Sequence, residues 1–340
     1  MRKIVFNTAK YLSFLAIGLV ILWLLYRKIE WIKLRSALHE LKYIFILLSV
    51  IFGLLSQYSR ALRWKMLIEP MGYRPGTQNI FLSVLVLYFV NLVLPRAGEV
   101  ARCTVLSRTD KIPFTKLVGT VFTERLADVL MLFLLAAIII PMKFSVIIGI
   151  FQKNPALSRN FKQLFSTQNI MILILAGIFI LVLLYFSYKL LKRSRIRDKL
   201  IELKDHFILG IKSIAHMKNK WVFIGHTVFI YAMWLVMLYV VFLAYKPTAH
   251  LTITDGMITF LMGGLAMLAP VQGGIGPWHA MVIITLEALN IGVEEGKIFA
   301  LIAHTSTNLI YILWGGIALL ILFVRYGNRA IRFKPAENNS

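Results

Sequence analysis

Cysteine is almost absent from this chain of 340 residues, which contains Cys103 alone. A single cysteine excludes a disulfide within the chain and any metal site built from several cysteines. Acidic residues are also scarce, with 15 Asp and Glu against 38 Lys and Arg, which gives a net charge of +23. The basic residues are spread between apolar stretches, and no zinc-finger or RNA-binding motif occurs. We therefore predict that the positive charge sets membrane topology and attracts anionic lipids, and that nucleic acid is not a partner.

The motifs of common enzymes are missing as well. The seven histidines show no HExxH-type spacing, and the chain has no Walker A loop, nucleophile elbow or Rossmann fingerprint. We therefore expect no metal, no cofactor and no ATP-driven transport, and a non-enzymatic role is favoured. His279 follows a glycine-rich segment and His304 lies in a long apolar stretch. Either could titrate or bind a polar group, although an internally hydrogen-bonded histidine is the favoured interpretation.

Apolar residues, in contrast, make up 59% of the chain. Apolar stretches lie near residues 11–26, 43–62, 78–94, 114–140, 169–188, 221–245, 256–269, 278–291 and 297–325. A helix needs about 20 residues to cross a bilayer. Because no small-residue cleavage site follows the first stretch, we interpret it as a retained span and not as a signal peptide. The pattern predicts an all-α polytopic membrane protein.

Two of these apolar regions are interrupted by proline and glycine. The first break is Pro95-Arg96-Ala97-Gly98-Glu99-Val100-Ala101-Arg102, and the second contains Pro270, Gly273, Gly274, Gly276 and Pro277. Free backbone groups and lone charges survive at membrane depth only inside a protein bundle or beside water. The apolar arms at 256–269 and 278–291 are too short for full crossings. We predict re-entrant hairpins over 78–107 and 256–291.

The distribution of Lys and Arg predicts how the chain is oriented. The basic segment 189–220, the turn with Arg60, Arg63 and Lys65, and both termini are expected in the cytoplasm. The basic segment 27–42 must then be external, and its composition favours an amphipathic helix on the outer surface. The predicted organisation is a first repeat (1–140), an external loop (141–168), a second repeat (169–325) and a cytoplasmic tail (326–340). About six full crossings and two hairpins would then form an inverted repeat, as in secondary transporters, although an accidental hydropathy pattern is the alternative.

The charged residues near the first break are the candidate substrate-binding groups. They are Arg60, Arg63, Arg96, Glu99, Arg102, Glu124, Arg125 and Asp128. Arg96, Glu99 and Arg102 recur every three positions, which would place them on one side of a helix. Arginine suits phosphate because its planar fork can bind two oxygens, so we expect a charged vestibule for a lipid head group. Two alternatives stay open: a structural network of mutual ion pairs, and a role of Arg60 and Arg63 as interfacial anchors beside Trp64.

The sequence resembles a known family at Arg63-Trp64, Asn91, Leu94 to Arg102 and Glu124 to Asp128. It is similar to the lysylphosphatidylglycerol synthase transmembrane family, also called flippase-like integral membrane proteins, over residues 10 to 325. The resemblance implies an inner-membrane protein related to the half of a bifunctional enzyme that moves aminoacylated phospholipid between leaflets. Residues that match the motif are Arg63, Arg96, Glu99, Arg102, Glu124 and Arg125. The chain departs from the family at Trp278-His279, where an acid is common, and at His304 or Thr305, where an arginine is common.

The expected function is that of a lipid translocase, or a lipid-binding relative of one, in a bacterial-type inner membrane. Its partners would be a phospholipid, an aminoacyl lipid or a lipid-linked glycan, and homo-oligomerisation is left open. About fifteen residues follow the last span, so the soluble aminoacyltransferase domain is not expected and the chain should not make aminoacyl lipid. One alternative is an enzyme or enzyme subunit that modifies a lipid-linked head group, for instance with Glu99 and Glu124 as a dyad. Another is a scaffold that recruits a partner through the segment 189–220.

Overall fold

The computed structural model describes residues 18–153, 219–269 and 271–327, together with the isolated positions 16, 159, 171 and 175. All of the regular elements in these ranges are helices. The longest are α3 (Tyr43–Ile68), α6 (Phe114–Met142), α11 (Lys220–Ala244) and α14 (Val293–Tyr326). Each of the four, with α3 continued to Met71, is long and apolar enough to cross a membrane. The prediction of an all-α polytopic membrane protein is therefore confirmed.

The remaining helices of the described ranges are shorter. They are α2 (Trp31–Glu40), α4 (Thr77–Val93), α5 (Gly98–Thr109), α7 (Phe144–Lys153), α12 (Ile253–Ala266) and α13 (Pro277–Ala288), with single 3₁₀ turns η1 (Glu69–Met71), η2 (Lys246–Thr248) and η3 (Gln272–Gly274). Several predictions lie wholly or partly outside the described residues: the start of the span at 11–26, most of the span at 169–188, most of the basic segment 189–220, most of the tail 326–340, and Pro270.

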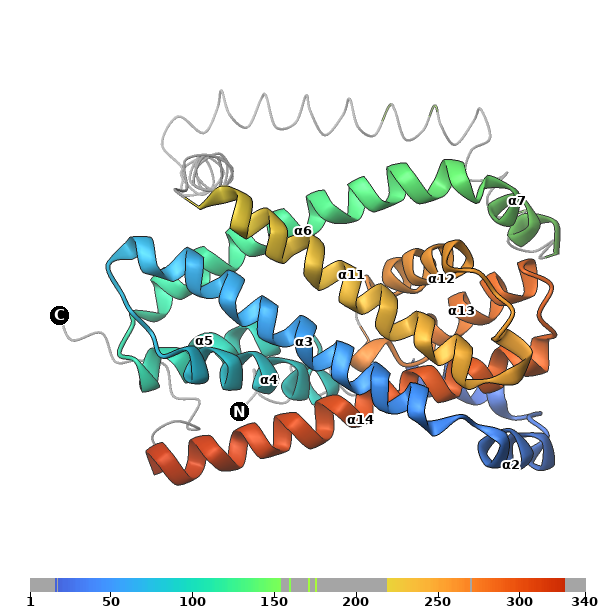
Figure 1. Ribbon diagram of the computed structural model, residues 1–340, viewed down its shortest axis with the longest axis horizontal. Coiled ribbons are helices and arrows are strands. Elements are labelled where there is room, and N and C mark those ends of the chain that lie inside the picture. Colours follow the sequence, from blue (N-terminus) through green and yellow to red (C-terminus); the bar gives the residue numbers. More distant parts are fainter. Residues whose placement is uncertain are drawn as a thin grey trace.

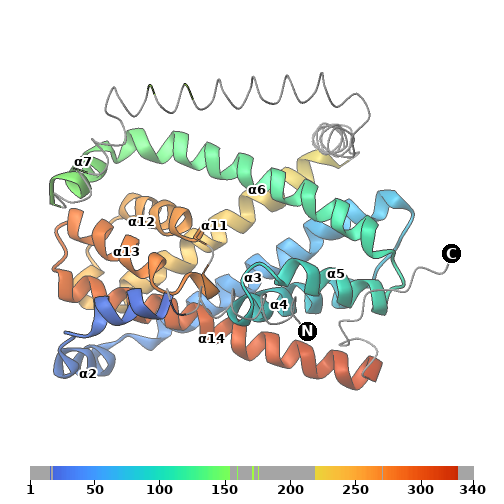
Figure 2. The ribbon, with the colours of Figure 1, turned by 180° about the vertical axis from the view of Figure 1, so that it is seen from behind.

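The four long helices run lengthwise through the molecule, whereas the two broken pairs occupy opposite halves of it (Figures 1 and 2). Helices α4 and α5 form one pair, and α12 and α13 form the other. The outer ends of the first pair are joined, because Asp110 Oδ1 accepts from the Gly76 backbone N at 2.9 Å. Asn79 Nδ2 also donates to Asp110 Oδ2 at 3.0 Å. The chain therefore leaves and returns at the same end of the molecule, as predicted for the first break.

The first break is a tight turn that only glycine can close. A Cβ atom on Gly98 would lie 2.2 Å from the Leu87 carbonyl oxygen, so any larger residue would collide with the backbone of α4. Asn91 Oδ1 accepts from the Gly98 backbone N at 2.8 Å and thereby satisfies one of the free N–H groups at the start of α5. Arg96 precedes this helix and has a φ of +62°. The expectation that Arg96 shares one side of a helix with Glu99 and Arg102 is therefore wrong.

The second break is built on Gly276, whose φ of +91° favours glycine, and on Pro277 at the first position of α13. The two breaks contact each other. A Cβ on Gly273 would lie 3.0 Å from Leu92 Cδ2 at the end of α4. Arg96 Nη2 also donates to the Leu268 carbonyl oxygen at 3.1 Å, directly after α12. Side chains and backbone of the two hairpin tips are thus in contact.

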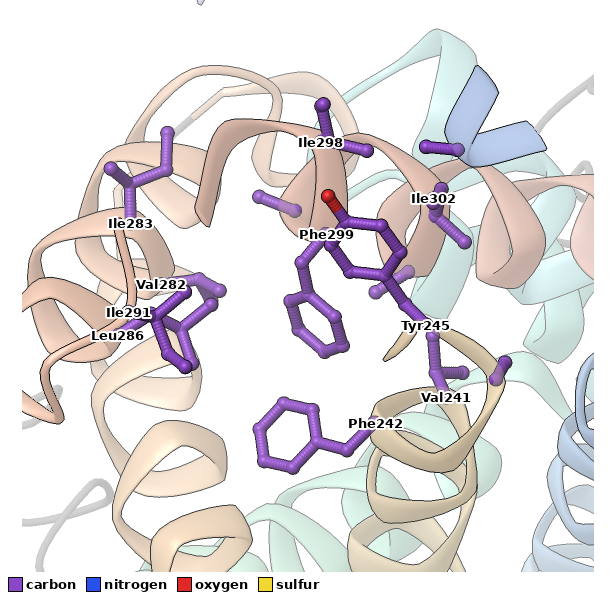
Figure 3. Packing of buried hydrophobic residues seen from close by; sticks show 14 of the residues in the cluster. Val241, Phe242, Tyr245, Val282, Ile283, Leu286, Ile291, Ile298, Phe299 and Ile302 are labelled. Carbon is purple, nitrogen blue, oxygen red and sulfur yellow. The ribbon is translucent and has the colours of Figure 1, made fainter. Parts of the chain in front are cut away.

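A hydrophobic core holds α11, α13 and α14 together in the half that contains the second break (Figure 3). The rings of Phe242 and Phe299 lie at its centre, with their centroids 4.6 Å apart. Helix α2 covers this core with Leu34 and Ala37, while Ile32 stays 86% exposed. The expected helix in the segment 27–42 is therefore present, and its apolar face packs partly on the protein.

Two boundaries differ from the sequence predictions. The turn expected to begin near residue 60 starts only after Ile68, because α3 continues through Arg60 and Arg63. These two side chains and Trp64 are buried, so the alternative that they are interfacial anchors is wrong. The predicted loop 141–168 begins as helix α7, which buries Val146 and Ile150.

A buried cluster of ion pairs as the candidate functional site

Three helices each contribute charged side chains to one cluster. The charge cluster consists of Arg60 and Arg63 from α3, Glu99 and Arg102 from α5, and Glu124, Arg125 and Asp128 from α6. Within each helix the members facing the cluster are three or four residues apart, except that Arg125 adjoins Glu124. Residues at that spacing share a helix face, so each helix directs one charged face toward the other two. Seven of the eight predicted binding residues are brought together in this way.

Glu124 lies at the centre of the charge cluster and its side chain is fully buried. Its Oε1 atom is 2.8 Å from Arg60 Nε and 3.0 Å from Arg63 Nη2. The second oxygen, Oε2, is 2.7 Å from Arg102 Nη2. Arg125 Nη2 lies 3.6 Å from Oε1. Four guanidinium groups thus surround one carboxylate, which is the arrangement that a buried charge needs in order to be tolerated.

The other two carboxylates connect the arginines at the edge of the cluster. Asp128 Oδ1 is 2.7 Å from Arg63 Nη2, and Asp128 Oδ2 is 3.2 Å from Arg125 Nη1. Glu99 Oε1 is 3.1 Å from Arg125 Nη2, and Glu99 Oε2 is 2.6 Å from Arg102 Nη2. Each carboxylate therefore bridges arginines from different positions in the chain. This connectivity agrees with the alternative of a structural ion-pair network.

The charge cluster nevertheless contains more cation than mutual pairing requires. Among the described residues, four arginines face three carboxylates, which leaves one positive charge in excess. Buried guanidinium nitrogens without a hydrogen-bond acceptor among the described residues include Arg63 Nε, Arg102 Nε, Arg102 Nη1 and Arg125 Nε. Arg125 is 42% exposed and Glu99 27% exposed, whereas the other arginines are buried. The cluster can thus accept a further anionic oxygen and is open to its surroundings at Arg125.

Neutral side chains hold the buried arginines in place. Arg60 Nη1 donates to the Tyr88 hydroxyl, and the Tyr88 ring stacks on Tyr311 of α14 with centroids 4.6 Å apart. Arg63 Nη1 donates to Thr227 Oγ1 at 3.1 Å. The guanidinium of Arg102 lies 4.3 Å from the ring centroid of Trp64, a cation–π contact. Sequence reasoning missed Tyr88 and Thr227, because both occur singly in long apolar stretches and only their partners across the bundle make them conspicuous.

Arg96 is the one predicted binding residue that lies apart from the cluster. It is exposed and contacts Leu268 at the junction of the two breaks. The cluster itself is formed by α3, α5 and α6, with no described member from α12 or α13. The sequence predicted that the charged side chains would meet between the two broken hairpins. The described residues do not form such a site.

The two histidines singled out in the sequence form a pair beside the second break. His304 Nε2 is 2.8 Å from the Gly273 carbonyl oxygen, which can only accept, so we assign the proton to Nε2. Asn308 Nδ2 then donates to His304 Nδ1 at 3.0 Å. The ring of His279 lies 4.3 Å from that of His304, and Trp278 adjoins both. Among the residues with described positions, no group of three or more His, Cys, Asp or Glu is arranged to hold a metal ion.

The chain has recognisable relatives. The family described as "Lysylphosphatidylglycerol synthase TM region" matches residues 12–315. The chain is also 24% identical over 290 residues to the UPF0104 membrane protein MJ1595 of Methanocaldococcus jannaschii, a match that covers 82% of this chain and 84% of that protein. No solved structure matches the chain at a significant level.

Proposed function

The chain belongs to the lysylphosphatidylglycerol synthase TM region family, and we propose that it binds a lipid with an anionic head group at the charge cluster and moves that head group across the membrane. The observation that carries this proposal is the excess of one arginine over the carboxylates in a buried site. A purely structural network would be expected to balance its charges, because each uncompensated charge at membrane depth is costly.

The phosphate of a phospholipid is the anion that fits this chemistry. A phosphodiester carries one negative charge, which equals the excess in the cluster, and guanidinium groups bind phosphate oxygens through two parallel N–H donors. The head group would enter at Arg125, the most exposed member, and would compete there with Glu99 and Asp128, its two closest carboxylate partners. The unpartnered nitrogens of Arg63 and Arg102 lie deeper and supply further donors.

The movement would come from two opposed repeats. In this proposal six full crossings and two re-entrant hairpins form an inverted repeat, with both termini in the cytoplasm of a cell with an inner membrane. The contact between the two breaks, at Arg96 and Leu268, supports it, since broken hairpins of transporters meet inside the membrane. Rocking of one repeat against the other would expose the head group to each side in turn, while the acyl tails remain in lipid.

Arg125→Gln tests the proposal because it removes the excess charge at an exposed position. The purified protein is reconstituted in sealed vesicles that contain a fluorescent phosphatidylglycerol in the inner and outer leaflets, and an impermeant quencher reports transfer between them. We expect transfer to fall about tenfold or more, since a hydrogen bond to a charged group contributes about 1.5–3 kcal/mol. Thermal unfolding should change little, because Arg125 is 42% exposed. Arg35→Gln, at an exposed position of α2, serves as the matched control.

Normal transfer by the Arg125→Gln protein would contradict the proposal. Two rival functions predict other results. An enzyme that modifies a lipid-linked head group would form product in detergent micelles, where no sidedness exists. A scaffold would lose function when the basic segment 189–220 is neutralised, and Arg125→Gln would leave it unaffected.

A further inference from the structure

One buried amide in the centre of the bundle has no role in the arrangement described so far. Gln57 lies on α3 and is 1% exposed. Neither its Oε1 nor its Nε2 atom has a hydrogen-bond partner among the described residues. Buried amides are nearly always hydrogen-bonded, because desolvation of an unpaired polar group is costly. Gln57 incurs this desolvation cost at both of its polar atoms, which points to a functional role for its side chain.

The position of Gln57 links it to the charge cluster. It precedes Arg60 by three residues, so the two side chains lie on the same face of α3, about one turn apart. On that face Arg60 contacts Tyr88 of α4 and Glu124 of α6. Gly53 lies about one turn before Gln57 on α3, on the side away from Arg60. A Cβ on Gly53 would lie 3.0 Å from Met237 of α11 and 3.4 Å from Ile310 of α14. Gln57 is therefore located where these helices converge, next to the deepest part of the cluster.

Other unpartnered polar groups continue the same row. Ser49 lies eight residues before Gln57, which is two further turns along this face, and its Oγ atom is buried without a partner in the described part of the chain. On the neighbouring helix α11 the Nε1 atom of Trp234 is also buried, with no hydrogen-bond partner in the described ranges. Arg60, Gln57 and Ser49 thus form a polar row along one face of α3.

We infer that Gln57 is a second contact for the cargo and selects head groups that can exchange hydrogen bonds beyond their phosphate. This inference rests on the proposed function, because it takes the phosphate to be bound by the arginines. Arg60 Nη2 is also buried without a hydrogen-bond acceptor among the described residues. A phosphate oxygen bound to Arg60 Nη2 would leave the rest of the head group near Gln57, which lies about one helical turn from Arg60. An amide both donates and accepts, which matches a hydroxyl or an amide on the head group and does not match a methyl group. The ligand class is therefore a phosphodiester lipid whose head group bears hydroxyl or amide groups.

Two phosphodiester lipids of equal charge provide the test. The head group of phosphatidylglycerol is a glycerol with two free hydroxyls, and phosphatidylmethanol has a methyl group in place of that glycerol. Transfer of fluorescent forms of both is measured in sealed vesicles for the wild type and for Gln57→Met, which keeps the side chain unbranched and of similar length. We expect the variant to transfer phosphatidylglycerol about tenfold more slowly, the equivalent of one hydrogen bond, and phosphatidylmethanol at the wild-type rate.

Matched measurements separate this inference from a structural effect and from failure of the proposed function. Gln78→Met changes an exposed glutamine at the start of α4 and should affect neither lipid. The thermal stability of Gln57→Met should equal or exceed that of the wild type, because an unpartnered amide is removed. An equal loss for both lipids, or no loss for either, would overturn the role of Gln57 while the effect of Arg125→Gln remains. A wild-type protein that transfers neither lipid would overturn the proposed function and this inference with it.

Discussion

The two breaks of this protein have similar backbones but differ in the side chains beside them. Each is a short glycine-dependent turn between two short helices, and the two turns touch each other. Beside the first break lies the charge cluster, in which four arginines and three carboxylic acids meet among the described residues. Beside the second lies the neutral pair of His279 and His304, with Trp278 and Asn308. Similar backbone architecture is therefore accompanied by a charge cluster beside one break and not beside the other, among the described residues.

Under the proposed function, this difference suggests separate roles for the two halves in binding and releasing the head group. An anion that is bound equally well along its whole path gains nothing by moving, whereas one that passes from a cationic site to a neutral one can be released. The first break would then capture the head group, and the second would supply hydrogen bonds and aromatic surface on the way out. Three substitutions, in order of decreasing effect, test whether the two halves differ in this way.

The largest effect is expected for Glu124→Gln. The substitution leaves Arg60, Arg63 and Arg102 without the carboxylate that they share, and breaking a buried ion pair typically costs about 3–5 kcal/mol. We expect a loss of that size in the free energy of unfolding in detergent, measured by thermal or chemical denaturation. Glu69→Gln, at a side chain that is 48% exposed, should change it by less than about 0.5 kcal/mol. An equal effect of both substitutions would mean that the charge cluster is not the stabilising centre of the first half.

A smaller loss is expected for Gly98→Ala. The added Cβ would lie 2.2 Å from the Leu87 carbonyl oxygen, and the backbone of the first break must shift to accommodate it. Overpacking of this kind costs about 1–3 kcal/mol. Gly264→Ala is the matched control in the hairpin of the second break, because a Cβ there meets nothing within 4 Å and alanine favours the helix by up to about 1 kcal/mol. Unfolding should therefore occur at lower temperature for the first variant and at an equal or higher temperature for the second.

The smallest effect is expected for His304→Leu. It removes one hydrogen bond to the Gly273 carbonyl oxygen and one from Asn308, in a site that holds no charge. The expected loss of stability is about 1–2 kcal/mol, and His304→Gln should restore part of it because an amide can donate to the same oxygen. Transfer of phosphatidylglycerol should fall less than in Arg125→Gln. A greater fall would show that capture of the anion depends on the second break as well.

Much of the local structure could be predicted from the sequence. Proline and glycine in Pro95–Gly98 and Gly273–Pro277 predicted both breaks, because these residues either cannot continue a helix or permit backbone angles that others avoid. The spacing of Glu99 and Arg102, three residues apart, predicted that these two side chains share a helix face. Those relations depend only on neighbours along the chain.

The errors arose where the outcome depended on the rest of the molecule. Arg96 was grouped with Glu99 by spacing, but the turn at Pro95 and Arg96 places it before α5, and its side chain contacts Leu268. Arg60 and Arg63 were assigned to a surface turn because they are charged, yet carboxylates from α6 allow α3 to carry them inside the bundle. Gln57 drew no attention, since a single glutamine in an apolar stretch is conspicuous only when its partners are found to be missing.

The sequence alone determined that this chain is a helical membrane protein with two interrupted hairpins and with charges in helical register. These properties follow from hydrophobicity and from the short-range periodicity of the helix. The tertiary structure decided which charges pair, that four arginines meet three carboxylates, and that Arg125 is the exposed member. Ion pairing is decided by distances of a few ångströms between residues far apart in the chain, and only the packing of the helices sets those distances.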